Sequence, residues 1–204
     1  MTVFVIVGKN GVGKTIVGNY LMDNGFKLIE IRGVLNSIPE HKNKSSVYYA
    51  ERKTKVLELT MPYIINELKV SKNIIIEGIL SKDEIFFLKK FISDFHIIYT
   101  HSNKTYRINR IKLRSNYKSK KEAINNVAKS DFFRSKIMGV DEVKKYANLI
   151  IKNNSNSKLE LLNATEKGVK SVLIKQIINF LKSKSKNKIL DKSQKKPRRP
   201  YIKK

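Results

Sequence analysis

Eight residues near the amino terminus, residues 8–15 (Gly-Lys-Asn-Gly-Val-Gly-Lys-Thr), constrain this chain more than any other stretch. They match the phosphate-binding pattern G-x-x-x-x-G-K-[ST] at every fixed position. Residues 2–7 are an apolar run typical of a buried strand, and residues 15–22 have a helical pattern. Strand, glycine-rich loop and helix in this order are the context in which the pattern binds phosphate, whereas an ordinary glycine turn is the competing interpretation.

The residue types in this loop suit an anion. Gly8, Gly11 and Gly13 carry no Cβ, so the backbone can curl with its N–H groups turned toward a phosphate. The positive end of the following helix adds to this cradle. We expect Lys14 to reach the β- and γ-phosphates of a nucleoside triphosphate, and the Thr15 hydroxyl to coordinate Mg²⁺. The remaining loop residues are expected to contribute mainly backbone groups: Lys9, Asn10 and Val12.

Composition sets limits on the rest. A chain of 204 residues is long enough for one domain with a sizeable core. It has no cysteine, which excludes disulfides and thiolate metal sites. No run approaches the roughly 18 apolar residues of a membrane span, and the amino terminus lacks the basic segment of a secretory signal. We therefore expect a soluble, cytoplasmic protein whose chemistry uses oxygen and nitrogen groups with Mg²⁺.

The net charge of +26, from 43 basic and 17 acidic residues, is unusually high. Such a charge attracts polyanions, including nucleotides, nucleic acid and anionic membrane surfaces. The chain is also rich in Lys, Asn and Ile, as expected from an AT-rich genome. That bias explains the excess of lysine equally well without any function.

Two apolar runs end in a carboxylate. Residues 26–31 are expected to form a second strand with Glu30 and Arg32 at its carboxyl edge, where ligands bind in open α/β sheets. Glu30 could accept a proton from an acceptor hydroxyl or help to position Mg²⁺, and Arg32 could bind an acceptor phosphate. A solvated strand end is the competing interpretation of both. Residues 73–78 form a β-branched strand, and we expect its Glu77 to hold a Mg²⁺-bound water or to orient the nucleophile.

Residues 35–46 contain a proline and several polar side chains and are expected to form a loop. A helical pattern follows over residues 46–70. Within it Tyr48, Tyr49 and Arg52 could form an acceptor pocket, with the rings stacked on a base and Arg52 paired with a phosphate. Aromatic residues in such a pattern more often belong to the core, which is the alternative.

The most basic internal segment, residues 103–121, holds eight Lys or Arg residues and no acid. Three of its arginines share one face of the predicted helix at i, i+3 and i+7: Arg107, Arg110 and Arg114. The helix follows a strand's carboxyl end, so we expect these guanidinium groups to approach the γ-phosphate and stabilise charge on the transferred group. A solvated basic face is the alternative. With a second helical arm over residues 122–137, residues 103–137 would form a lid over the nucleotide.

The last part of the chain changes character. Residues 147–152 are expected to form a fifth strand, and Asn153 starts a loop that could approach the nucleotide base, although a plain turn is an equally good interpretation. Residues 157–181 have a helical rhythm interrupted by Gly168. Residues 182–204 contain eleven Lys or Arg and one acid. We expect these residues to form a disordered basic tail that contacts nucleic acid non-specifically.

Four segments, in order, resemble P-loop nucleotide kinases, in particular dephospho-coenzyme A kinase and related archaeal nucleotide-kinase-like proteins. The segments are FVIVGKNGVGKTIVGNYLMDNGFKLIEI, NIIIEGILSKDEIFFLKKF, RINRIKLR and GVDEVKKYANLIIKNN. The resemblance covers roughly residues 3–181. It implies one kinase-like domain over residues 1–181, with an α/β three-layer P-loop fold, a parallel five-stranded sheet, a helical lid and ATP with Mg²⁺ as the phosphate donor.

By matching position, Lys14 and Thr15 bind the triphosphate and metal, and Glu30 falls where dephospho-coenzyme A kinase has a catalytic Asp. The chain departs from that enzyme at four positions: Glu30, Arg32, Glu77 and Asn148. The resemblance therefore implies a kinase of a nucleotide or similar small phosphorylated acceptor, either nucleoside monophosphate-like or dephospho-coenzyme A-like. Two alternatives are a nucleic-acid-associated P-loop ATPase or polynucleotide 5′-hydroxyl kinase, and a module that binds nucleotide without chemistry.

Overall fold

The computed structural model describes residues 1–115, 117 and 119–193. The chain divides into two compact units, Met1–Gly168 and Val169–Lys204. The first unit holds the strands and the candidate site, and the second contains only the later part of the last helix and the residues after it. In the described ranges, no helix combines the length and the apolar character that crossing a membrane requires.

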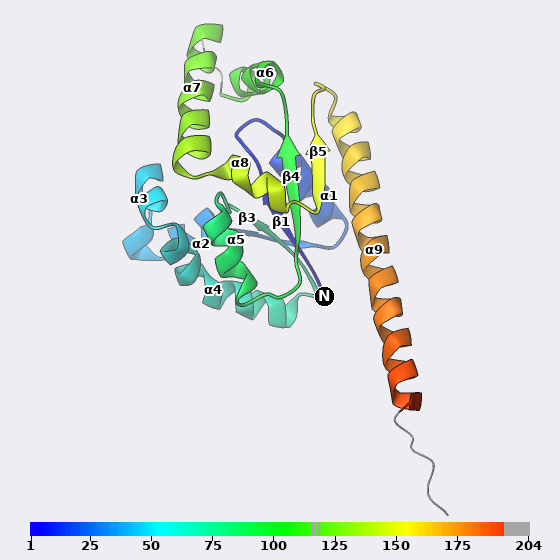
Figure 1. The fold of residues 1–204 in the computed structure, drawn as a ribbon. Coiled ribbons are helices and arrows are strands. Elements are labelled where there is room, and N and C mark those ends of the chain that lie inside the picture. Colours follow the sequence, from blue (N-terminus) through cyan, green and yellow to red (C-terminus); the bar gives the residue numbers. More distant parts are fainter. Residues whose placement is uncertain (116, 118, 194–204) are drawn as a thin grey trace, which may run out of the picture. The chain divides into compact units, whose positions relative to one another are not determined.

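One sheet of five parallel strands forms the centre of the first unit, in the order β2-β3-β1-β4-β5 (Figure 1). The strands are β1 (Thr2–Val7), β2 (Lys27–Glu30), β3 (Asn73–Glu77), β4 (His96–His101) and β5 (Leu149–Lys152). The three central strands are runs of mostly β-branched residues that are buried on both faces, as a parallel sheet covered by helices requires. The expected parallel five-stranded α/β fold is confirmed.

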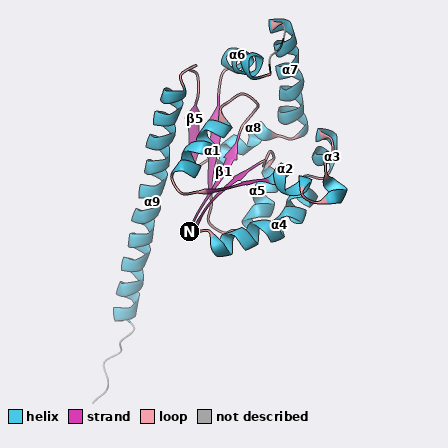
Figure 2. Ribbon diagram, turned by 180° about the vertical axis from the view of Figure 1, so that it is seen from behind, coloured by secondary structure: helices cyan, strands magenta, loops and turns pink. Residues whose placement is uncertain are grey.

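Helices lie on both faces of this sheet, with α5 and α8 in front of it in Figure 1 and α1 in front of it in the reverse view of Figure 2. The α-helices are α1 (Lys14–Asp23), α2 (Ile31–Asn36), α3 (Ser46–Glu51), α4 (Lys53–Val70), α5 (Lys82–Lys89), α6 (Lys104–Arg114), α7 (Lys120–Phe132), α8 (Val140–Val143) and α9 (Lys158–Ser193). Within the described residues there are also three short turns: the 3₁₀ turns η1 (Pro39–His41) and η3 (Lys144–Tyr146), and the π-helical turn η2 (Phe133–Ile137).

Successive side chains of β1 point to opposite faces of the sheet, so this strand contributes to the core on both faces. Val3, Val5 and Val7 join the main apolar cluster with residues of α4, α5 and α8. Ile6 points to the other face, where a Cβ at Gly18 of α1 would lie 3.9 Å from its Cδ1. Because both faces are filled, β1 is held rigidly and delivers the glycine-rich loop at its carboxyl end to a fixed position.

Between β2 and β3, several elements begin or end at residues other than those predicted. The strand ends at Glu30 and α2 begins at Ile31, so Arg32 lies in the first turn of a helix instead of at a strand edge. Ile31 and Leu35, spaced i and i+4, are both buried, and this helical face overrides the β-propensity of isoleucine. The predicted loop over residues 35–46 consequently includes the end of α2 and the turn η1. The predicted single helix over residues 46–70 is two helices, α3 and α4.

The segment between β4 and β5 begins with a hairpin of two helices, α6 and α7. Its apolar face forms a small cluster of its own, made of Ile108, Ile111, Ala123 and Val127. Ser119 caps α7 by accepting a hydrogen bond from the Glu122 amide, which accounts for where that helix begins. We call α6 and α7 together the α6–α7 hairpin.

The last helix, α9, is longer than predicted. It passes Gly168 without a break, and a Cβ at Gly168 would lie 2.7 Å from the side chain of Leu149, so glycine permits the close passage of the helix beside β5. It also continues beyond residue 182, the predicted start of a disordered tail, to Ser193. No glycine or proline occurs over residues 169–196, so nothing in that stretch breaks the helix. The rest of the predicted tail, residues 194–204, lies outside the described residues.

Candidate active site

The glycine-rich loop follows β1 directly and leads into α1. Gly8 and Gly13 have φ values of 152° and 100°, a region that side-chain-bearing residues avoid. A Cβ at Gly8 would lie 2.4 Å from the Thr100 carbonyl oxygen, and a Cβ at Gly13 would lie 2.7 Å from Asn153 Nδ2. The loop therefore has the tight curl predicted from its sequence, and the curl depends on glycine at these two positions.

Lys14 lies within the loop, with its side chain only 14% exposed. Its Nζ donates a hydrogen bond to the Lys9 carbonyl oxygen at 3.2 Å and lies 4.0 Å from Glu77 Oε1. Burial, with a further contribution from Arg134, lowers the pKa of Lys14 to about 8. The ammonium group is thus held where its charge is poorly compensated, which favours an incoming anion.

Glu30 and Glu77 lie side by side at the carboxyl ends of β2 and β3, where they are register partners. Burial raises the pKa of the Glu77 carboxyl group; Lys14 acts against this and Glu30 adds to it. From the sequence we predicted only that each carboxylate ends a strand; the pairing of β2 with β3, which makes the two carboxylates neighbours, is a finding of the structure.

These groups line one cavity of about 570 Å³. Of the predicted site residues, those that line it are Asn10, Lys14, Thr15, Glu30, Arg32, Glu77 and Arg114. Further lining residues come from α2 to α4, from the start of α5 and from the region around η2; among them are Leu35, Tyr49, Glu84, Ser130 and Met138. The phosphate loop, both strand-end glutamates and two of the predicted arginines therefore face the same space.

Arg107 and Arg110 contact the phosphate loop and are not among the residues that line the described cavity. Arg107 is 3% exposed, forms an ion pair with Asp131 of α7 and donates from Nε to the Asn10 carbonyl oxygen at 2.7 Å. Arg110 donates to the Gly11 carbonyl oxygen at 3.0 Å, to Ser102 and to residues after β5. Only Arg114, one turn further along α6, lines the cavity, because the first two turns of the helix pack against the loop itself.

Asn153 also contacts the loop, through its side chain. It is 4% exposed, and its Nδ2 donates to the Val12 carbonyl oxygen at 2.8 Å. Its own backbone N–H donates to the His101 carbonyl oxygen at 2.7 Å, which extends the pairing of β4 with β5. The side chain of Asn153 thus holds the phosphate loop, while the approach of its backbone to a nucleotide base stays a prediction.

Arg52, predicted to pair with a phosphate of the acceptor, lies on the surface. It is exposed, pairs with Glu51, and its guanidinium lies 4.3 Å from the centre of the Tyr48 ring. It is not among the residues that line the described cavity, whereas Tyr49 is. The break between α3 and α4 falls at Arg52, so the residues of the predicted single helical face separate there.

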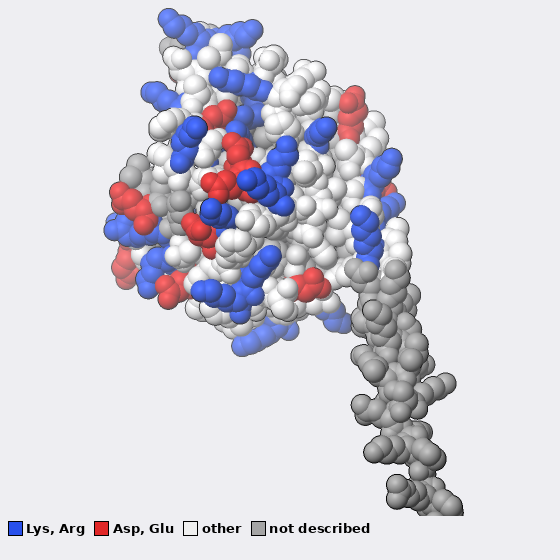
Figure 3. Space-filling view, viewed as in Figure 1, with Lys and Arg blue, Asp and Glu red and all other residues white. Residues whose placement is uncertain are grey.

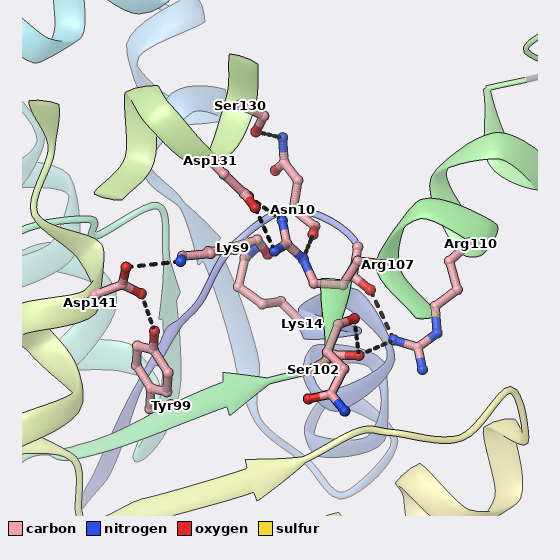
Figure 4. Close-up of polar contacts among 12 residues, drawn as sticks. Lys9, Asn10, Lys14, Tyr99, Ser102, Arg107, Arg110, Ser130, Asp131 and Asp141 are labelled. Atoms are coloured by element: carbon pink, nitrogen blue, oxygen red, sulfur yellow. Dashed lines mark hydrogen bonds and ion pairs between the residues drawn. The ribbon is translucent and has the colours of Figure 1, made fainter. Parts of the chain in front are cut away.

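Lys9 has a partner beyond the loop. Its Nζ lies 2.8 Å from Asp141 Oδ2 of α8, and the hydroxyl of Tyr99 donates to Asp141 Oδ1 at 3.0 Å (Figure 4). Burial opposes ionisation of Asp141, but hydrogen bonds from Lys9 and Tyr99 bring its pKa below the ordinary value. The side chain of Lys9 thereby fastens the start of the loop to β4 and α8.

Arg134 is a lining residue that the sequence did not identify as functional. It lies in the π-helical turn η2, and burial lowers its pKa. It is close enough to Lys14 and Glu77 to influence the pKa of both. A π-helical turn has no sequence signature, and it changes which side chains face the cavity.

Thr15 and Glu77 are the residues that could hold a metal ion here. Both line the cavity, and a hydroxyl and a carboxylate are the hard oxygen ligands that Mg²⁺ prefers. In the described part of the chain, no three His, Cys, Asp or Glu side chains form a metal-binding group. A Mg²⁺ ion fits these residues with phosphate oxygens and water as its other ligands, which is the usual arrangement for this ion.

On the face shown in Figure 3, the basic residues do not form one continuous patch. Lys and Arg are distributed over that face, with Asp and Glu among them. A continuous basic groove of the kind that tracks a nucleic-acid backbone is not visible on this side.

The sheet order, the loop and the flanking helices together define the fold of the P-loop kinases, an α/β class. No protein-family model matches the chain, and no curated protein matches its sequence.

Several solved structures share the fold. An uncharacterized protein from Eubacterium ventriosum ATCC 27560 is 13% identical with a TM-score of 0.59, covering 84% of this chain and 98% of that one. A gluconokinase from Sinorhizobium meliloti 1021 is 11% identical with a TM-score of 0.55, covering 87% and 97%. A shikimate kinase from Bacteroides thetaiotaomicron is 14% identical with a TM-score of 0.54, covering 84% and 98%. At these identities the likeness establishes the fold.

Proposed function

We propose that the protein is an ATP-dependent kinase that transfers the γ-phosphate of ATP to a nucleotide or similar small phosphorylated acceptor. The observation that carries this proposal is the single cavity lined by Lys14 and Thr15 of the phosphate loop and by the neighbouring carboxylates Glu30 and Glu77. A switch or motor needs the loop but has no need of an acceptor space beside it. A cavity of about 570 Å³ is within the range of small-molecule sites.

The donor side consists of the loop amides, Lys14 and Thr15. Lys14 supplies a positive charge for the triphosphate, and its pKa of about 8 leaves most of it protonated at neutral pH. Thr15 and Glu77 would hold Mg²⁺, which neutralises charge on the phosphates when bound. The cradle needs only backbone groups from Lys9, Asn10 and Val12. This agrees with their side chains, because Lys9 and Asn10 have polar partners outside the loop and Val12 is apolar.

The acceptor side consists of the residues around β2 and α2. Glu30 is exposed at the end of β2 and would accept the proton of the acceptor hydroxyl. Arg32 would bind the acceptor's phosphate through its fork of N–H donors. Arg114 and Arg134 line the same cavity and would stabilise negative charge on the transferred group.

Labelled ATP with a panel of acceptors tests this proposal. The panel contains ribonucleoside and deoxynucleoside monophosphates, dephospho-coenzyme A and an oligonucleotide with a 5′-hydroxyl end. We expect transfer to one of the small phosphorylated acceptors, loss of transfer in Lys14→Ala, and normal transfer in Lys112→Ala, an exposed lysine of α6. Full activity of Lys14→Ala would overturn the proposal.

The same panel also distinguishes the proposed kinase from the nucleic-acid-related functions that the net charge of +26 suggested. Transfer to the oligonucleotide alone would identify a polynucleotide 5′-hydroxyl kinase. ATP hydrolysis that is stimulated by RNA or DNA, with no acceptor phosphorylated, would identify a nucleic-acid-associated ATPase. ATP binding without either reaction would leave a nucleotide-binding module.

A further inference from the structure

Three consecutive carbonyl groups of the phosphate loop accept hydrogen bonds from side chains outside the loop (Figure 4 shows the two arginines involved). The pairs are Arg107 Nε with Asn10 O at 2.7 Å, Arg110 Nη1 with Gly11 O at 3.0 Å, and Asn153 Nδ2 with Val12 O at 2.8 Å. Two donors come from α6 and one from the loop after β5. The backbone of the loop is therefore held at three consecutive peptides, from Asn10 to Gly13.

Peptide geometry makes these contacts decisive for anion binding. In a trans peptide the C=O and the following N–H point in opposite directions. Fixing the carbonyls of residues 10–12 therefore turns the N–H groups of Gly11, Val12 and Gly13 away from the three side chains. Those N–H groups are the donors that a phosphate needs, and a glycine-rich loop has the freedom to turn its peptides over when nothing holds them.

We infer that Arg107, Arg110 and Asn153 are positioning residues that preorganise the phosphate loop. This inference rests on the proposed function and deepens it, because it replaces the expected contact of two arginines with the γ-phosphate by a contact with the loop. The charges on the transferred group are then met by Arg114 and Arg134, which line the cavity.

The surroundings of Arg107 support this role. Its Nε donates to the Asn10 carbonyl, and its two terminal nitrogens donate to the carboxylate of Asp131 on α7. With 3% exposure and a carboxylate partner, the guanidinium is both buried and neutralised. The Nδ2 of Asn10 also donates to Ser130 Oγ at 2.7 Å, so both helices of the α6–α7 hairpin hold the same loop residue.

Arg110 and Asn153 form one connected network. Nη2 of Arg110 donates to the Asn153 carbonyl oxygen at 2.9 Å and to Asn153 Oδ1 at 3.0 Å, and also to the Ser155 carbonyl oxygen. Oδ1 accepts from Arg110 while Nδ2 of the same amide donates to Val12, which fixes the orientation of the Asn153 side chain. The loop after β5 thereby acts on the phosphate loop through a rigid amide.

Arg107→Lys distinguishes positioning from direct action. Lysine keeps the positive charge but cannot donate to Asn10 and make the paired contact with Asp131 at once. We expect isothermal titration of Mg·ADP to show about tenfold weaker binding, the effect of losing one hydrogen bond of ordinary strength. The backbone amide resonance of Gly11 in an NMR spectrum of the free protein should also shift. Lys112→Ala, on the same helix, should change neither.

Affinity within twofold of wild type together with an unchanged Gly11 resonance would overturn the inference. If Arg107→Lys does not fold, Asn153→Ala decides, because it removes the donor to Val12 without leaving a buried charge; the same tenfold loss is expected, and unchanged affinity overturns the inference. A wild-type protein that binds Mg·ADP but phosphorylates no acceptor would refute the proposed kinase reaction and leave the positioning role intact. A wild-type protein that binds no Mg·ADP would refute both.

Discussion

Replacing Lys14 by methionine should make the protein more stable at neutral pH while abolishing phosphoryl transfer. The pKa of Lys14 falls from its ordinary 10.5 to about 8 on folding, chiefly through burial. At about 1.4 kcal/mol per pH unit, holding this side chain protonated in the folded protein costs about 3 kcal/mol. Methionine has a similar length and no charge. Part of the gain is offset because Glu77 loses its cationic neighbour at 4.0 Å, so we expect a net gain of about 1–2 kcal/mol.

The pH dependence of this gain is specific. Below the folded pKa of about 8, both folded and unfolded chains hold the proton, and the cost is fully present. Between about 8 and 10.5 only the unfolded chain binds it, so wild-type stability rises with pH relative to the variant. The advantage of Lys14→Met should therefore shrink across this window.

Urea-induced unfolding of both proteins from about pH 7 to about pH 10 measures the effect. Lys112→Met, at an exposed position of α6, serves as the control and should change stability little at any pH. A Lys14→Met protein that is less stable than wild type at neutral pH, or whose advantage is the same at both ends of the range, would refute the reasoning.

Three further variants test other contacts. Gly8→Ala places a Cβ 2.4 Å from the Thr100 carbonyl oxygen and should cost about 2–4 kcal/mol in thermal unfolding, against about 1 kcal/mol for Gly25→Ala, which has φ 83° but open space. Arg134→Ala should lower kcat about a hundredfold at nearly constant Tm; an unchanged kcat would remove it from the site. Glu30→Gln should bind ATP normally and lose about 10²–10⁴ in transfer rate, whereas normal transfer would exclude it as the base.

The parts predicted correctly from the sequence depend on local pattern. The phosphate loop has a fixed spacing, and β1 and β3 are apolar β-branched runs of strand length. Glu30 and Glu77 were each predicted at the carboxyl end of a strand, the edge where ligands bind in open α/β sheets. None of these inferences needs knowledge of how helices pack.

The parts that were missed depend on packing. Helical spacing places Arg107, Arg110 and Arg114 on one side of α6, but it cannot say how closely each turn approaches the loop. In the structure, the first two arginines reach loop carbonyls and only the third reaches the cavity. Arg134 enters the cavity from a π-helical turn, which has no sequence signature.

The separate apolar cluster of the α6–α7 hairpin has a consequence for local unfolding. Ile108, Ile111, Ala123 and Val127 bury little surface compared with the main core, so the hairpin can open at a lower free energy than the whole protein. Its amides should exchange with deuterium together and before those of β1. Each such opening breaks the contact of Arg107 with Asn10, so for the proposed nucleotide site we expect the dwell time of a bound nucleotide to depend on the rate at which this hairpin opens.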